Sequence, residues 1–162
     1  GCGYGPATAI SWFFENVDEG IILEDDCVPE ISFFKYCAVL LEKFRYDNRI
    51  AIISGSNFDR MNTFIPGTSS YFFSVFPFTW GWATWKRNWD KFDYFIKKWG
   101  EIDKNEFLKY LFKEAEFQKA WRIVFDEIYL KTPIDIWDYQ FFFSCFLQKQ
   151  LSIVPSVNLI ST

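Results

Sequence analysis

Residues 20–37, GIILEDDCVPEISFFKYC, pass from an apolar run directly into three consecutive acids. The run IILE at 21–24 is typical of a short strand that is buried on both faces. Glu24, Asp25 and Asp26 repel one another, and their desolvation is costly unless a cation or strong hydrogen-bond donors lie nearby. Because such a cost is tolerated mainly where the charges are used, these acids are the first candidates for a functional site.

The segments that follow the acids predict an α/β fold. Apolar residues recur at helical spacing in 29–45, and IAIIS at 50–54 is typical of a second buried strand. A strand, a helix and a strand in this order predict a right-handed parallel unit within the sheet. In open parallel sheets, ligands bind beyond the carboxyl ends of the strands, which is where the three acids lie.

The length of 162 residues is enough for one domain with a substantial core, and further elements surround the parallel unit. We expect a Gly-rich loop and a helix within 1–20, a loop at 57–70, a strand at 70–76, a helical stretch at 105–131, a buried helix at 136–150 and a short strand at 151–155.

Composition excludes several classes of protein. Half of the residues are hydrophobic and 23% are aromatic, which excludes a disordered tail. The net charge of -4 disfavours a nucleic-acid partner, because phosphate backbones select basic surfaces. The chain has no His, and its four Cys show no CxxC spacing, so classical zinc sites and Ser-His or Cys-His catalysis are excluded.

Other features of the chain bear on where the protein works. No apolar run reaches transmembrane length, and no signal-peptide pattern is present. The four Cys are expected to be reduced residues of the core, which fits the cytoplasm. The first residue is Gly rather than Met, and GCGYGP is typical of the middle of a loop, so we expect the natural N-terminus to lie upstream.

The acid triplet has the chemistry of a hard-cation site. Mg²⁺ and Mn²⁺ prefer carboxylate oxygens and usually share them with substrate phosphates. The triplet therefore predicts a metal–diphosphate site, with one acid on the metal and the others oriented toward sugar hydroxyls or ordering the loop. The simpler alternative is a solvated acidic turn or a helix N-cap cluster, since Glu30 also precedes a helix.

The segment IILEDDCVPEISFFKYC resembles the metal-binding segment of nucleotide-sugar glycosyltransferases of the GT-A fold. It is most similar to the Glu-Asp-Asp variant of the DxD motif in the animal N-acetylglucosaminyltransferases that act on N-glycans. GCGYGPATAISWFFENV is similar to the Gly-rich loop and helix that precede this strand in family 2-like bacterial transferases. The resemblance implies that Asp26 binds Mn²⁺ or Mg²⁺, and that Glu24 and Asp25 lie near the ribose and sugar of the donor.

The same resemblance implies the architecture of a nucleotide-diphospho-sugar transferase, a three-layer α/β/α fold with a mostly parallel central sheet. Residues 1–162 correspond to the C-terminal major part of that domain. The earlier strand–helix–strand segment, which holds the nucleobase in the family, has no counterpart before Gly1.

A glycosyltransferase that inverts the anomeric carbon needs a base to take the proton from the acceptor hydroxyl. With no His available, Asp138 and Asp135 are the candidates. Asp138 opens an apolar helix between Trp137 and Tyr139 and is either this base, with a raised pKa, or a plain helix cap. Asp135 lies outside the helix opening and is more typical of a loop or cap residue. In the resembling family, a Trp-Asp pair near the C-terminal end carries the base, so the resemblance points to Asp138, although Tyr139 departs from the second acid of the animal enzymes.

Four tryptophans gather in FTWGWATWKRNW at 78–89. Trp82, Trp85 and Trp89 are spaced as on one face of a helix, and core packing is the preferred interpretation for Trp85 and Trp89. Two basic residues that follow, Lys86 and Arg87, are further candidates for contact with a diphosphate.

The segment Trp80-Gly81-Trp82 has a different character. Gly81 lets the backbone approach a ligand closely or adopt a positive φ. Because aromatic faces stack on the apolar side of sugar rings, Trp80 and Trp82 are candidate contacts to the donor or acceptor sugar. Trp137, next to the candidate base, joins this set of sugar-binding or acceptor-binding residues, and a Gly-Trp segment occupies the same position in the resembling family.

These expectations describe a metal-dependent inverting glycosyltransferase. It would move a sugar from a nucleotide-diphosphate donor, with a UDP-sugar favoured, to a hydroxyl of a glycan or lipid-linked glycan, as in bacterial polysaccharide biosynthesis. A non-catalytic carbohydrate-binding module with a structural Ca²⁺ is the alternative. A hydrolase that uses Glu24 or Asp25 with Asp138 is a third interpretation.

Two further partners follow from the sequence. The stretch 91–131 mixes Lys with aromatic residues and either lies on an anionic membrane, at the inner face, or forms a solvated helix pair with interleaved acids. A fold without its first part also exposes a sheet edge, which is open to pairing with a second copy of the chain.

Overall fold

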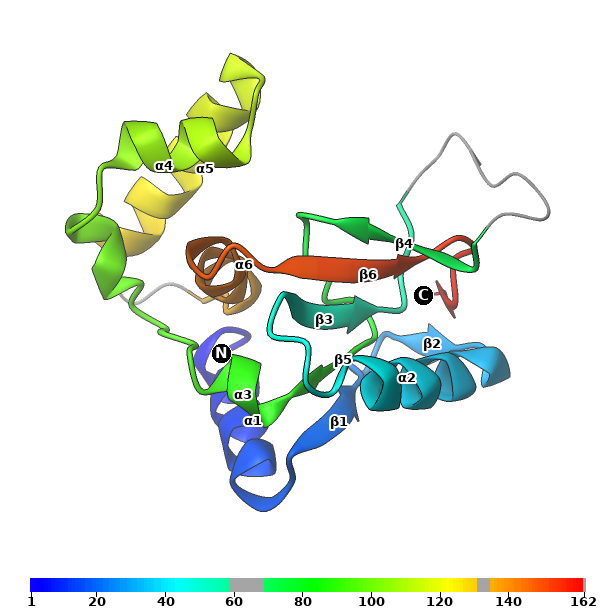
Figure 1. Cartoon of the computed structure of the whole chain (residues 1–162). Helices are drawn as coiled ribbons and strands as arrows, with labels where there is room; N and C mark the ends of the chain where they lie inside the picture. The colour runs from blue at the N-terminus through cyan, green and yellow to red at the C-terminus, as the bar shows by residue number, and fades with distance from the viewer. Residues whose placement is uncertain (59–68, 131–134, 162) are drawn as a thin grey trace.

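The structure, a computed structural model, describes residues 1–58, 69–130 and 135–161, and the structural statements below refer to these residues. A five-stranded sheet has the strand order β1-β5-β3-β6-β4 (Figure 1). Its strands are β1 (Glu19–Ile22), β3 (Ile50–Ser54), β4 (Tyr71–Ser74), β5 (Trp82–Trp85) and β6 (Leu151–Pro155). A small second sheet pairs β2 (Val28–Pro29) with β7 (Ile160–Ser161). The helices are α1 (Tyr4–Asn16), α2 (Ile31–Phe44), α3 (Lys86–Trp89), α4 (Lys104–Leu111), α5 (Ala115–Leu130) and α6 (Asp138–Leu147), with a short 3₁₀ helix η1 (Lys97–Gly100).

The prediction of a mostly parallel sheet, and with it the GT-A fold class, is wrong. Within the described residues, β3 and β6 form the one parallel pair, and the other neighbours of the main sheet are antiparallel. The molecule is an α/β fold with a mostly antiparallel mixed sheet. Strands β1 and β3 do run in the same direction within one sheet, but they are not neighbours, because β5 lies between them and pairs antiparallel with both.

The spacing of Trp82, Trp85 and Trp89 predicted one face of a helix, but the first two of these residues lie on strand β5. Trp82 and Trp85 belong to one strand, where side chains three positions apart point to opposite faces. Accordingly, Trp82 packs in the cluster beneath α1 and α6, and Trp85 packs in the cluster beneath α2. Trp89 alone lies on a helix, the single turn of α3. The spacing that resembled a helical stripe therefore reflects one strand that is buried on both faces.

Helices cover both faces of the sheet. On one face, α2 buries Phe33, Cys37, Leu40 and Leu41 against β3, β5 and β6. On the other face, α1 and α6 pack over Ile52 and Trp82. A third cluster joins α4, α5 and η1 to the far side of α6, so this helix pair lies away from the sheet (Figure 1). Helix α6 thus belongs to two clusters at once and connects the helix pair to the sheet.

Most of the other predicted elements are confirmed, including the strand at 50–54 and the helices within 1–20, 29–45 and 136–150. The helical stretch at 105–131 forms α4 and α5, apart from Lys131, which lies outside the described residues. Residues 59–68 of the predicted loop also lie outside them.

The four Cys are free thiols, of which Cys37 and Cys145 are buried while Cys2 is exposed. Among the described helices, none is both long and apolar enough to cross a membrane.

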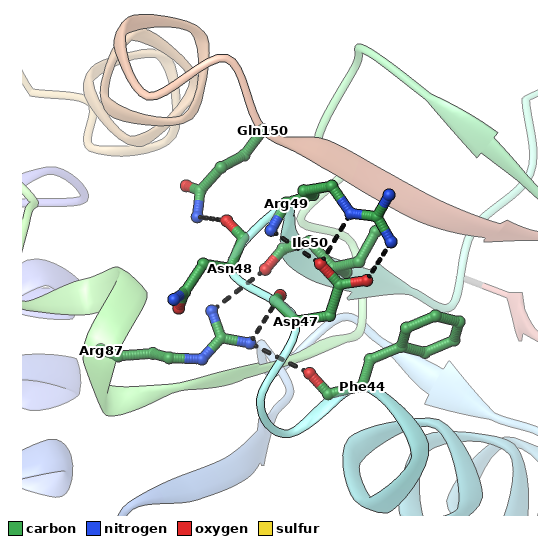
Figure 2. A network of polar contacts seen from close by, with 7 residues as sticks. All are labelled: Phe44, Asp47, Asn48, Arg49, Ile50, Arg87 and Gln150. Carbon is green, nitrogen blue, oxygen red and sulfur yellow. Dashed lines mark hydrogen bonds and ion pairs between the residues drawn. The ribbon is translucent and has the colours of Figure 1, made fainter.

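Arg87 closes the connection between α2 and β3. Its guanidinium donates to the backbone carbonyls of Phe44, Asp47 and Ile50, each at 3.2 Å (Figure 2). It also stacks on the Trp85 ring, with its central carbon 4.3 Å from the ring centroid. The Phe44 and Asp47 carbonyls each also accept one backbone N–H, so the planar guanidinium adds a second donor to acceptors that lie between the end of a helix and the start of a strand.

Replacement of Arg87 by Lys should destabilise the protein by about 1–3 kcal/mol, because an ammonium group cannot serve the spread of carbonyls that the planar guanidinium reaches. Arg49 offers a matched control in the same connection. Its side chain is 85% exposed and pairs with Asp47 at 2.7 Å, so Arg49→Lys should change the stability by less than about 0.5 kcal/mol. Urea unfolding of both variants measures the two effects, and equal losses would contradict this role for Arg87.

Gly81 should not tolerate a side chain. Its φ is +61°, and an added Cβ would lie 2.5 Å from Cδ1 and 2.6 Å from Cγ1 of Ile160. We expect Gly81→Ala to lower the free energy of unfolding by about 1–3 kcal/mol. Gly5, in α1, has open space around an added Cβ, so Gly5→Ala should instead stabilise the protein by up to about 1 kcal/mol. Denaturant titration decides between these opposite signs.

Candidate functional site

The antiparallel insertion of β5 determines which segments meet at one end of the sheet. Ile22, at the end of β1, and Ser54, at the end of β3, both pair with Trp82, the first residue of β5. The segments that follow β1 and β3 and the segment that precedes β5 therefore converge. This end of the sheet carries the acid triplet on one side and Trp80 on the other.

A cavity of about 360 Å³ lies at this end of the sheet. Its described lining consists of Glu24, Asp26, Phe58, Phe78, Thr79, Trp80, Asp138, Tyr139 and Phe142. Three of these side chains are carboxylates and five are aromatic, and no basic residue is found in the described lining. The volume falls in the range of small-molecule sites in proteins.

Glu24 begins the tight turn that follows β1, and Asp26 lies within it. The Cys27 N–H donates to the Glu24 carbonyl at 3.1 Å and closes this turn. Glu24 remains accessible to solvent, yet the surrounding protein partly desolvates its carboxyl and thereby raises its pKa. Repulsion from Asp26, Asp138 and Asp25 raises that pKa further. The carboxylates of the turn after β1 and the carboxylate at the start of α6 are therefore close enough to influence one another.

Asp138 is the first residue of α6 and is partly buried. Burial raises the pKa of its carboxyl, while the backbone N–H groups of Tyr139 and Asp138 act in the opposite direction without cancelling the shift. A carboxylate at a helix N-terminus is ordinarily favourable. Here the desolvation by neighbouring side chains outweighs that benefit, which is the condition for a carboxylate with enhanced basicity.

The Trp80 side chain is held in the cavity by contacts of its backbone. The Ser56 hydroxyl donates to the Trp80 carbonyl, and the Ser54 hydroxyl donates to the Phe78 carbonyl at 2.8 Å. The Gly55 N–H donates to the Gly81 carbonyl at 2.7 Å. The end of β3 therefore fixes the segment that precedes β5. From this position the Trp80 indole N–H donates to Asp26 Oδ1 at 3.4 Å.

Some of the predicted site residues lie elsewhere. Trp82 and Trp137 are buried in the core, where their rings stack with centroids 5.7 Å apart, so neither offers a face to a sugar. Gly81 has the positive φ that was anticipated, but the space beside it is filled by Ile160 rather than by a ligand. Asp25 is exposed on the turn and is absent from the cavity lining. The side chains of the predicted set that line the cavity are thus Glu24, Asp26, Trp80 and Asp138.

The other charged residues that the sequence offered for the site, Arg87, Lys86 and Asp135, have structural roles away from the cavity. Arg87 lies at the opposite end of the sheet, bound to carbonyls, and Lys86 donates to the Phe14 carbonyl, so neither reaches this cavity. Asp135 accepts the Gly3 N–H at 2.8 Å and anchors the start of α1. A second cavity, of about 650 Å³ at that opposite end, is bordered by paired charges such as Arg45 with Glu19 at 2.7 Å.

Sequence reasoning missed the aromatic walls of the cavity. Phe58 follows the end of β3, where the rule that ligands bind beyond carboxyl ends of strands would have found it. Phe78 and Thr79 precede β5 and could be found only with that strand assigned. Phe142 lies four residues after Asp138 and three after Tyr139 on α6, and these are the spacings that bring side chains together on one helix surface.

The donor chemistry of the site fits a hard cation that is shared with a ligand. The lining supplies carboxylate oxygens, which Mg²⁺ and Mn²⁺ prefer. Among the described residues, however, no group of three His, Cys, Asp or Glu could enclose a metal ion by itself. A cation here would need oxygens from a bound molecule or water to complete its coordination, as Mg²⁺ sites with substrate phosphates do.

The raised pKa of Asp138 predicts that this carboxylate destabilises the fold at neutral pH. Its bound proton contributes stability that is complete below the unfolded-state pKa of about 3.9 and is lost as the pH rises through the higher folded-state value. Asp138→Asn should therefore raise the free energy of unfolding at pH 7 by about 0.5–2 kcal/mol. The gain should shrink as the pH falls toward about 4, as thermal unfolding over this pH range would measure.

Asp135 provides a control with the opposite sign. The N–H groups of Gly3 and Cys2 lower the pKa of its carboxyl, so this charge stabilises the fold above the unfolded-state pKa. Asp135→Asn should lower the stability at pH 7 or leave it unchanged. A stabilisation of similar size in both variants would indicate a general effect of reduced negative charge rather than the local burial of Asp138.

Comparisons of the sequence with protein-family models and with curated proteins give no relative for this chain. What the chain does must therefore be argued from the geometry and chemistry of the cavity.

Proposed function

We propose that this chain carries the active site of a metal-dependent inverting glycosyltransferase whose donor is a nucleotide-diphosphate sugar. The observation that supports the proposal most strongly is that Glu24, Asp26, Trp80 and Asp138 line one cavity although they come from three distant segments of the sequence. Carboxylates for a cation, a carboxylate with a raised pKa and an aromatic face are the groups that this chemistry needs in one place.

In the proposed reaction, Asp26 holds Mn²⁺ or Mg²⁺ together with the diphosphate of the donor. When bound, the cation would supply positive charge that stabilises the departing diphosphate. The need for it follows from the lining, because a diphosphate would otherwise face Glu24, Asp26 and Asp138 with no basic side chain in the described lining of the cavity. Glu24, which stays accessible at the cavity, would accept hydrogen bonds from hydroxyls of the donor.

Asp138 would act as the base that takes the proton from the acceptor hydroxyl. Its partial burial raises its pKa toward the range in which a carboxylate is an effective proton acceptor. Trp80, which is 37% exposed, and Phe58, which is 51% exposed, offer faces for the apolar side of a sugar ring. Their rings lie 6.0 Å apart at 35°, so they form one tilted wall of the cavity.

Calorimetry with two probes tests the proposal. We expect inorganic pyrophosphate and a UDP-sugar to bind the protein in the presence of Mn²⁺ and to show no measurable affinity after chelation of the metal. Asp26→Asn should weaken this metal-dependent binding by more than about tenfold, because a neutral amide is a poorer ligand for a hard cation. Asp18→Asn, which changes an exposed acid at the other end of β1, is the matched control and should bind like the unmodified protein.

The alternatives predict different results in the same experiment. Binding of a glycan with Ca²⁺ but without affinity for pyrophosphate or nucleotide would favour a carbohydrate-binding module. Release of free sugar from a glycoside without any nucleotide would favour a hydrolase. Either result would overturn the proposal.

Asp138→Asn should separate donor binding from transfer. The variant should keep the Mn²⁺-dependent affinity for the donor, because Asp26 is intact. Its transfer of sugar to a hydroxyl acceptor should fall by about 10²–10⁴-fold, the range attributed to a positioned base. The measurement is single-turnover transfer from a radiolabelled donor, and a loss of donor affinity equal to the loss of transfer would contradict the role of Asp138 as the base.

A further inference from the structure

We infer that Trp80 is a positioning residue for Asp26: its indole N–H holds one carboxylate oxygen so that the other faces the cation. The inference rests on the proposed function, in which Asp26 is the metal ligand. It assigns Trp80 a second role besides the stacking of its ring on a sugar.

Asp26 has little else to orient it. Its side chain lies on an exposed turn, where a carboxylate can rotate among several conformations. The described residues make two side-chain hydrogen bonds to it, from the Trp80 indole N–H at 3.4 Å and from the Cys27 thiol at 3.8 Å. Both reach Oδ1, and a thiol is a weak donor. The indole is therefore the main restraint on this carboxylate, and it leaves Oδ2 available.

Trp80 itself is well placed to act as a fixed donor. Its carbonyl accepts a hydrogen bond from the buried Ser56 hydroxyl, and the next residue, Gly81, is tied to Gly55 by a 2.7 Å bond between backbone groups. Phe58 packs beside the indole ring. A continuous path of contacts thus runs from the buried end of β3, through Trp80, to the carboxylate of the turn after β1. Groups that orient a metal ligand in this way commonly tune the affinity of the site.

The first test is spectroscopic and needs no metal. The chain has eight tryptophans, so the indole N–H resonance of Trp80 can be assigned as the one that disappears from the ¹H–¹⁵N spectrum of Trp80→Phe. In the metal-free protein, Asp26→Asn should shift this resonance, because an amide oxygen is a weaker acceptor than a carboxylate. The indole resonance of Trp12, which is exposed on α1, should stay in place. An unmoved Trp80 resonance would overturn the inference.

The second test measures metal affinity. Titration of Mn²⁺ in the presence of pyrophosphate, followed by the electron paramagnetic resonance signal of the free ion, needs neither sugar nor turnover. Trp80→Phe keeps an aromatic ring but removes the N–H, and we expect about tenfold weaker binding of Mn²⁺, at the low end of the losses seen when an outer partner of a ligand is removed. Trp12→Phe makes the same chemical change away from the site and should leave the affinity unchanged.

The outcomes separate this inference from the proposed function. If the unmodified protein shows no pyrophosphate-dependent binding of Mn²⁺, the proposed function fails and the inference fails with it. If the unmodified protein binds and Trp80→Phe binds equally tightly, only the inference fails. A variant whose melting temperature falls together with its affinity would also overturn it, because Trp80 would then act on the fold rather than on Asp26.

Discussion

The antiparallel insertion of β5 between β1 and β3 is the constraint on which the site depends. Because Trp82 pairs with Ile22 on one side and with Ser54 on the other, the start of β5 lies where its two neighbours end. The insertion therefore brings Trp80 beside the acids that follow β1. A parallel neighbour in the same position would have presented its other end, and Trp80 would lie across the sheet from Asp26.

The two ends of the sheet differ in whether their charged side chains have partners of opposite charge or polarity within the protein. At one end, the Arg87 guanidinium is surrounded by carbonyls and by the Trp85 ring, so a partly buried cation has its partners within the protein. At the other end, Glu24 and Asp138 have raised pKa values and no basic partner in the described lining. The contacts of Arg87 stabilise the fold. The Glu24 and Asp138 carboxylates lower its stability, and a bound cation or proton would reverse that loss.

Of the nine described lining residues, sequence reasoning named Glu24, Asp26, Trp80 and Asp138. Glu24, Asp26 and Trp80 stand out locally as charged and aromatic residues next to element ends, while Asp138 was chosen through the family resemblance. Sequence reasoning failed for the sheet, since WATW at 82–85 carries tryptophans at a spacing that suits a helix as well as a doubly buried strand. Trp82 was proposed as a sugar contact because it follows Gly81 in Trp80-Gly81-Trp82, yet it is fully buried. Whether a tryptophan faces solvent or core depends on the packing of α1 and α6 over β5, which no local pattern contains.

Among the described residues, no set of side chains encloses a cation, and this bears on the choice between a structural Ca²⁺ and a metal shared with a substrate. A structural Ca²⁺ takes six to eight oxygen ligands, most of them from the protein. The described residues contain no group of three His, Cys, Asp or Glu that could hold a metal ion, while their cavity is lined by Glu24, whose pKa is raised by repulsion from the other two lining carboxylates, Asp26 and Asp138. A cation in such a place must be completed by oxygens of a second molecule. Among the described residues, the arrangement therefore lacks the protein ligands that a structural Ca²⁺ needs, and the metal of the proposed reaction would depend on an anionic ligand for its remaining oxygens.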